Sequence, residues 1–211
     1  RFDRVRMRAA LPALAELGLD VERLTATTGA MARARDALEE MTRECAARAL
    51  TVDATGAATL ASVAAAEELR LRLLAAVLQL VSGARYRPRL ADLERLAAAW
   101  AAGDLGGGRT LHGCLIRPEG PALRILREPA AVAPPGRADA LWDRRWRIAG
   151  APPGATLGAL GAEAGDAALA TTPALRAPDG TLLAAPVAQP DGRVTATFDP
   201  PDPLGLLPKP R

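Results

Sequence analysis

Arginine side chains, which suit phosphate binding, gather at three places in this sequence. The first eight residues contain four of them: Arg1, Arg4, Arg6 and Arg8. A guanidinium group is planar and donates paired hydrogen bonds to a phosphate. A helix would bring Arg1, Arg4 and Arg8 onto one face, because residues three and four apart are neighbours on a helix. The octet is therefore a candidate phosphate-binding surface, and the alternative is a basic helix end that meets only solvent.

Two further arginine clusters are candidates for the same chemistry. Arg85, Arg87 and Arg89 surround Pro88, which predicts a loop before a helix. Residues 141–148 predict a strand, whose side chains alternate between two faces. One face holds Trp142, Trp146 and Ile148, and the other holds Asp143, Arg145 and Arg147. We expect the tryptophan face to pack inward, and we leave open whether Arg145 and Arg147 contact phosphate or only solvent.

The total number of arginines is weaker support for nucleic-acid binding. Lys209 is the single lysine among 27 basic residues, so 27 − 1 = 26 are arginine, while the net charge is only +3. Asparagine is absent, and Ala, Gly and Pro are abundant. This composition is typical of a GC-rich genome, so position, and not number, makes the arginine clusters candidates.

Signatures of common catalytic sites are missing. His112 is the only histidine, and the two cysteines, Cys45 and Cys114, lack the paired spacing of a zinc site. The glycine-rich run 106–110 has no P-loop lysine and precedes a strand, so it predicts a turn. We therefore expect no catalytic residue and no metal site in this chain.

Hydrophobic spacing and turn residues predict an α+β fold: a helical domain with a small β-hairpin, followed by a small β-rich C-terminal domain. The predicted helices run from Asp3 to Leu17, from Asp20 to Ala49, from Glu67 to Val81, and from Pro88 to Gly103. Two short strands are predicted on either side of a turn at residues 53–56. Further strands are predicted over residues 110–117, 122–127, 141–148, 173–175, 181–187 and 193–198. A weak helix is predicted over residues 157–169. Residues 129–140 form a candidate linker, and residues 201–211 a loose tail.

No apolar run approaches the roughly 20 residues that a membrane-spanning helix needs. The basic first residues are not followed by the apolar run of a secretion signal. We therefore expect no membrane association and a cytoplasmic location.

The octet Arg1 to Arg8, followed by Leu11-Pro12, resembles the segment that closes the catalytic domain of bacterial tRNA(Ile)-lysidine synthetases, which are PP-loop ATPases. The predicted helices and hairpin up to Val132 are similar to the central helical domain of that family. Leu141-Trp142-Asp143-Arg144-Arg145-Trp146 and Leu182 to Pro186 resemble its C-terminal domains. The resemblance implies that residues 1–18 end a catalytic domain, 19–130 form a helical tRNA-binding or linker domain, and 141–200 a C-terminal domain.

Members of this family use ATP to adenylate the wobble cytidine of tRNA(Ile), and lysine then displaces AMP. The resemblance implies tRNA(Ile), lysine and ATP as partners, with ATP and Mg²⁺ held by a Ser-Gly-Gly-x-Asp-Ser motif that this sequence lacks. We therefore expect a fragment that binds neither cofactor, is inactive alone and positions tRNA; a homodimer is left open. The alternatives are a stand-alone helical module that binds nucleic acid or protein, and an unrelated scaffold protein.

Overall fold

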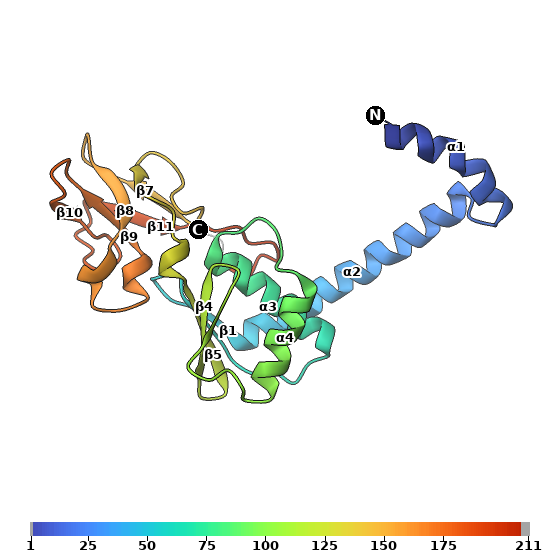
Figure 1. The fold of residues 1–211 in the computed structure, drawn as a ribbon, viewed down its shortest axis with the longest axis horizontal. Helices are drawn as coiled ribbons and strands as arrows, with labels where there is room; N and C mark the ends of the chain where they lie inside the picture. The colour runs from blue at the N-terminus through green and yellow to red at the C-terminus, as the bar shows by residue number, and fades with distance from the viewer. Residues whose placement is uncertain (1, 208–211) are drawn as a thin grey trace. The chain divides into compact units, whose positions relative to one another are not determined.

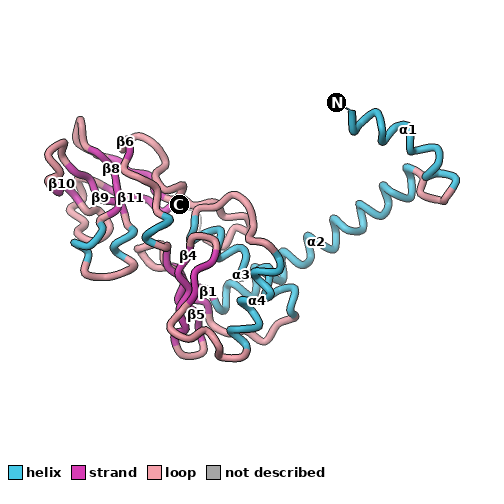
Figure 2. Tube along the Cα trace, viewed as in Figure 1, coloured by secondary structure: helices cyan, strands magenta, loops and turns pink. Residues whose placement is uncertain are grey.

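The computed structural model describes residues 2–207 (Figures 1 and 2). The chain forms two compact units, Arg1–Met41 and Thr42–Arg211. Helices and antiparallel sheets alternate along the described residues, which confirms the predicted α+β class. No helix formed by residues 2–207 is both long and apolar enough to cross a bilayer.

The first unit contains helix α1 and most of helix α2. Helix α1 spans Phe2–Glu16 and includes Pro12. Helix α2 spans Val21–Ala49 and begins as predicted, where the Asp20 carboxylate accepts a hydrogen bond from the Arg23 amide at 2.7 Å. Only the end of α2 that belongs to the second unit is buried: Cys45 is buried, whereas Met31, in the first unit, is 67% exposed.

The core of the second unit lies between helices and a sheet. Helix α3 (Glu67–Ser82) is charged only in its first turns, and every residue from Leu73 to Ser82 is buried. It packs against helix α4 (Leu90–Ala101) and against two strands of the sheet described next. Helix α3 ends at Gly83, which adopts the left-handed conformation (φ 70°) common after a helix, and α4 ends two residues before Gly103.

One five-stranded antiparallel sheet unites the predicted hairpins, in the order β1-β2-β5-β4-β3. Its strands are β1 (Leu50–Val52), β2 (Ala58–Leu60), β3 (Arg109–Leu111), β4 (Cys114–Glu119) and β5 (Ala122–Arg127). The single strand predicted over residues 110–117 was wrong, because His112 (φ 57°) and Gly113 (φ 72°) form a turn that divides it. The pairing of Ala58 with Ile125 joins the early and late hairpins.

Residues beyond 128 form two small sheets, with the orders β10-β9-β8-β6 and β11-β7. Their strands are β6 (Gly136–Arg137), β7 (Trp146–Ala149), β8 (Thr156–Ala159), β9 (Pro173–Arg176), β10 (Leu182–Ala184) and β11 (Thr195–Phe198). The weak helix predicted over 157–169 was wrong, because its start is strand β8. Only 3-10 turns, Gly161–Ala164 and Leu169–Thr171, lie further along.

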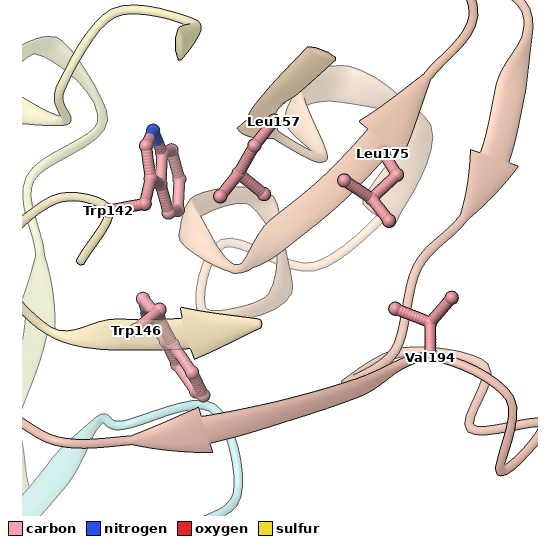
Figure 3. Close-up of a cluster of buried hydrophobic side chains, with 5 residues drawn as sticks. All are labelled: Trp142, Trp146, Leu157, Leu175 and Val194. Carbon is pink, nitrogen blue, oxygen red and sulfur yellow. The ribbon is translucent and has the colours of Figure 1, made fainter. Parts of the chain in front are cut away.

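A tryptophan cluster forms the core of this C-terminal part (Figure 3). The buried side chains of the cluster are Trp142, Trp146, Leu157, Leu175 and Val194. The Trp146 ring also lies 5.0 Å, centroid to centroid, from the ring of Phe198. The inward packing predicted for the tryptophans is therefore confirmed.

The candidate linker and the predicted loose tail both make specific contacts. In the candidate linker, Val132 and Ala133 pack against the tryptophan cluster. In the predicted tail, the Leu204 carbonyl accepts a hydrogen bond from Arg43 Nε at 3.0 Å, and the Asp202 carboxylate accepts one from the Leu206 amide at 2.7 Å. The chain from 200 to 207 is thus fixed to the second unit; residues 208–211 lie outside the described part.

Candidate nucleic-acid interface

The loop between α3 and α4 carries one predicted arginine cluster and is held at several points. The Arg85 carbonyl accepts a hydrogen bond from the Gln79 side-chain amide at 3.2 Å. The Tyr86 carbonyl accepts one from His112 Nε2 at 3.0 Å. Pro88 is buried. The backbone of this loop is therefore fixed by its neighbours on both sides of Tyr86.

The side chains of the same loop point to solvent. Arg85, Arg87 and Arg89 are exposed, and the Tyr86 side chain is 82% exposed. Within residues 2–207, no carboxylate forms an ion pair with any of the three arginines. Their guanidinium groups remain available to an external anion; phosphate binding itself stays a prediction.

Arg144, which the sequence did not single out, lies beside this loop. A Cβ built on Gly83 would be 3.1 Å from Arg144 Cβ. The charge of Arg144 also helps to lower the pKa of His112, the residue that holds the Tyr86 carbonyl. Arg144 is exposed and has no ion-pair partner among the described residues. We define the basic patch as Arg85, Tyr86, Arg87, Arg89 and Arg144.

The strand predicted over residues 141–148 is interrupted by a turn, and this changes the position of Arg145. Asp143 (φ 47°) and Arg144 (φ 57°) adopt left-handed conformations, so the expected alternation of faces was wrong here. The Arg145 side chain is 0% exposed. Arg145 was a candidate for either phosphate or solvent contact, and a buried guanidinium faces neither, so Arg145 is no longer a candidate phosphate ligand. Arg147 is exposed but pairs with Asp199, at 2.5 Å.

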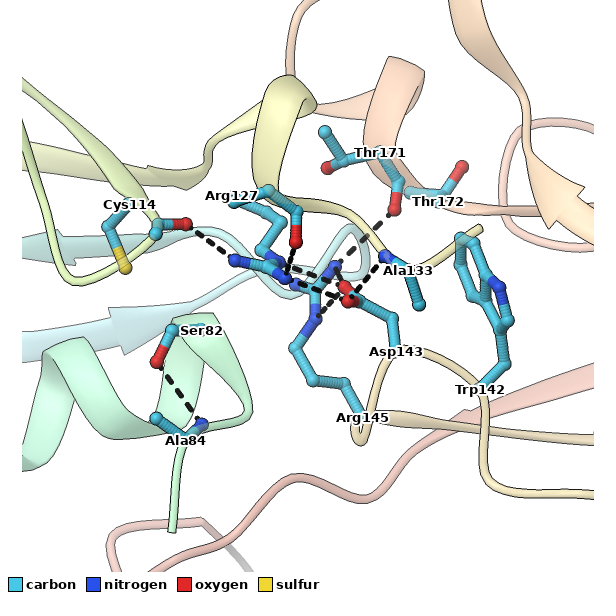
Figure 4. A network of polar contacts seen from close by, with 12 residues as sticks. Ser82, Ala84, Cys114, Arg127, Ala133, Trp142, Asp143, Arg145, Thr171 and Thr172 are labelled. Carbon is cyan, nitrogen blue, oxygen red and sulfur yellow. Dashed lines mark hydrogen bonds and ion pairs between the residues drawn. The ribbon is translucent and has the colours of Figure 1, made fainter. Parts of the chain in front are cut away.

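Arg145 instead belongs to a buried polar network centred on Asp143 (Figure 4). The Asp143 carboxylate accepts hydrogen bonds from Arg127 Nε and Arg145 Nε, each at 2.9 Å. It also accepts one from the Ala133 amide at 3.0 Å. Arg127 donates further to the carbonyls of Gly113, at 2.8 Å, and Ala131. The network joins the end of β5 to the turn before β7.

The charges in this network determine the protonation of Asp143. Burial alone would raise the pKa of the Asp143 carboxyl group. The hydrogen bond from Arg127 and the positive charges of Arg145 and Arg127 outweigh burial, so that pKa is lowered from its usual 3.8. Asp143 is therefore ionised at neutral pH and serves as the shared counter-ion of two arginines.

The predicted N-terminal arginines belong to the first unit. Arg4 and Arg8 are exposed on helix α1, one turn apart, as predicted. Arg1 lies outside the described residues. The role of this trio in phosphate binding stays a prediction.

Two common features of nucleotide and metal sites are not found among residues 2–207. No group of three or more His, Cys, Asp or Glu side chains within residues 2–207 could hold a metal ion. The glycine-rich run 106–110 leads from α4 into strand β3, which is the reverse of the strand-to-helix order that cradles phosphates.

A comparison with known proteins identifies a relative of this chain. The chain is 38% identical, over 164 residues, to a curated protein of Ruegeria pomeroyi named tRNA(Ile)-lysidine synthase. The match covers 71% of this chain and 36% of that protein, so the chain spans about a third of the length of its relative. No family model and no solved structure matches the chain. The resemblance predicted from the sequence is thus confirmed: this chain is homologous to part of a tRNA(Ile)-lysidine synthase.

Proposed function

We propose that this chain is the tRNA-positioning part of an ATP-dependent ligase that attaches lysine to the wobble cytidine of tRNA(Ile). The observation that carries the proposal is the basic patch, in which four exposed arginines lack carboxylate partners among the described residues. The relative named tRNA(Ile)-lysidine synthase makes a tRNA the most direct source of the phosphates they would bind.

Physical chemistry supports phosphate as the ligand of the patch. Elsewhere on the second unit, exposed arginines such as Arg137 and Arg147 pair with nearby carboxylates. Arg87 and Arg144 have no such partner among the described residues, so their charges are available to an external anion. Each arginine that contacts a phosphate releases counterions from the nucleic acid, which makes the binding sensitive to salt.

Catalysis would belong to residues outside this chain. ATP, Mg²⁺ and lysine would be bound by the other part of the ligase, in line with the lack of a metal-binding group of three or more His, Cys, Asp or Glu side chains within residues 2–207. The arginines would hold the tRNA while the reaction takes place elsewhere. The protein would act in the cytoplasm.

The exposed apolar surface of the first unit also supports the proposal that this chain is part of a longer ligase. Large apolar side chains on it are exposed, including Leu17 at 78% and Met31 at 67%. Apolar surface of this kind commonly marks an interface. We infer that further residues of the ligase cover it. The rival interpretation, a stand-alone interaction module, would use the same surface for a separate protein or a second copy.

A binding experiment tests the proposal. The 211-residue chain would be titrated into fluorescent tRNA(Ile) at several salt concentrations, with binding followed by anisotropy. Replacing Arg87 or Arg144 by Ala should weaken binding and reduce the slope of log affinity against log salt by about 1. Arg137→Ala is the matched control, because Arg137 is exposed but already paired with Asp139; it should leave both quantities unchanged.

The same titration separates the rival functions. An unchanged salt slope in both patch variants, with binding retained, would assign the tRNA contact to another surface. A chain that does not bind tRNA at all would remove the proposal and leave the interaction module. Sedimentation analysis of the chain alone would then show whether a second copy covers the first unit.

A further inference from the structure

The exposed ring of Tyr86 is unusual for this chain. Tyr86 is its only tyrosine, and the side chain is 82% exposed. The other aromatic side chains that the structure describes, those of Trp100, Trp142, Trp146 and Phe198, are all partly or fully buried. A ring left in water forgoes the burial that usually stabilises an aromatic side chain. Its position therefore needs a reason other than folding.

The exposure of Tyr86 does not result from a loosely held loop. His112 Nε2 donates to the Tyr86 carbonyl at 3.0 Å, and Gln79 fixes the preceding carbonyl of Arg85. On the other side, Pro88 is buried. The backbone is thus fixed before any ligand arrives, so ordering the loop costs little conformational entropy on binding.

The charges beside the ring identify the class of ligand. Arg85 and Arg87 adjoin Tyr86 in sequence, and Arg144 lies next to the start of the same loop. An aromatic face beside several guanidinium groups suits an unpaired nucleotide, whose base stacks on the ring while its phosphates bind the arginines. A duplex would offer the phosphates but keep its base faces hidden in the stack.

We propose that Tyr86 is a stacking platform for an unpaired nucleobase of the bound RNA, with Arg85, Arg87 and Arg144 holding the adjoining phosphates. This inference rests on the proposed function and deepens it, because it assigns the patch a single-stranded part of the RNA. The site needs no backbone rearrangement, since the hydrogen bonds to the carbonyls of Arg85 and Tyr86 do not involve the Tyr86 side chain.

The test compares three short labelled RNAs with equal numbers of phosphates: a single strand, the same strand made abasic, and a duplex. Tyr86→Ala should weaken binding of the chain to the single strand about tenfold. It should leave the abasic strand and the duplex unaffected. Tyr86→Phe should bind all three like the unchanged chain, because the ring and not the hydroxyl group stacks.

Arg87→Ala supplies the contrast, since loss of a phosphate contact should weaken binding of all three RNAs. Equal binding of the single strand by Tyr86→Ala and the unchanged chain would overturn the stacking role while leaving the proposed function intact. Failure of the unchanged chain to bind any RNA, tRNA(Ile) included, would instead overturn the proposed function and, with it, this inference. Because the Tyr86 ring packs on little else, Tyr86→Ala should keep the unfolding midpoint of the unchanged chain.

Discussion

Arg127 and Asp143 form a two-bond ion pair that is shielded from water. Arg127 Nε lies 2.9 Å from one oxygen of the carboxylate, and Arg127 Nη2 lies 2.8 Å from the other. The Arg127 side chain is 3% exposed and that of Asp143 is 1% exposed. Arg145 shares the same carboxylate. The pair links the five-stranded sheet to the tryptophan-containing part, and it fixes the turn that carries Arg144.

Removing the shared counter-ion should be costly. Asp143→Asn leaves two buried guanidinium groups without a negative charge, and breaking a buried pair costs about 3 to 5 kcal/mol. We expect urea unfolding at pH 7 to show a loss of that order. Asp139→Asn is the control, because Asp139 makes a comparable ion pair with Arg137 in full contact with solvent; its stability should not change measurably. Equal midpoints for Asp143→Asn and the unchanged chain would contradict the counter-ion role.

The same carboxylate should produce an acid-dependent loss of stability. The pKa of Asp143 is lowered in the folded state, because the contributions of Arg127 and Arg145 outweigh burial. Below pH 3.8 the unfolded chain therefore takes up a proton at this group more readily than the folded chain does. The contribution of Asp143 is complete above that pH and disappears as the pH falls through the lowered pKa. The stability difference between the unchanged chain and Asp143→Asn should thus be constant above about pH 5 and shrink in stronger acid.

Gly83 should tolerate a side chain less well than Gly103, although both glycines adopt nearly the same left-handed conformation (φ 70° and 68°). A Cβ on Gly83 would lie 2.8 Å from the Asp143 carbonyl oxygen, whereas one on Gly103 would meet nothing within 4 Å. Gly103→Ala should cost about 1 to 2 kcal/mol for the left-handed backbone alone. Gly83→Ala should cost about 1 to 3 kcal/mol more for the overlap. Thermal unfolding of both variants measures the difference, and equal losses would contradict it.

Local signals in the sequence were enough to predict the helices and most turns. Gly83 and Pro88 bracket the loop that carries the basic patch, and the periodic leucines before Gly83 predict α3. Long-range pairing could not be predicted in this way. Nothing near Ala58 indicates Ile125 as its partner, because the contact depends on how the helices between them fold back.

Only part of the candidate site could be predicted from the sequence, because the rest also depends on tertiary contacts. Arg85, Arg87 and Arg89 follow from a loop signal, and the structure leaves them exposed. Arg144 was missed, and Arg145 was wrongly placed on an outer face. Side chains were expected to alternate between two faces along residues 141–148, because the turn there contains neither Gly nor Pro. The left-handed conformations of this turn accompany the ion pair between Asp143 and Arg127, which is 16 positions earlier, in strand β5. A single sequence does not reveal such tertiary contacts.

The protonation of His112 connects the stability of the fold with the basic patch. Burial, assisted by the charges of Arg144 and Arg127, lowers the pKa of His112 from 6.5, although the hydrogen bond to the Tyr86 carbonyl opposes the shift. Between the lowered pKa and 6.5, the unfolded chain binds more protons than the folded chain, so stability should rise with pH and level off above 6.5. Because His112 is the only histidine, a single imidazole resonance reports its titration by NMR.

Two variants separate the effect of the His112 side chain on stability from the effect of the Arg144 charge on the pKa of His112. His112→Asn should remove the change of stability in that pH window while tolerating the left-handed backbone, which asparagine adopts more readily than most residues. Arg144→Ala should move the His112 titration toward higher pH, because one repelling charge is gone. A titration midpoint at or above 6.5 in the unchanged chain would refute the burial argument. An unshifted midpoint in Arg144→Ala would show that Arg144 does not act on the residue that holds the Tyr86 loop.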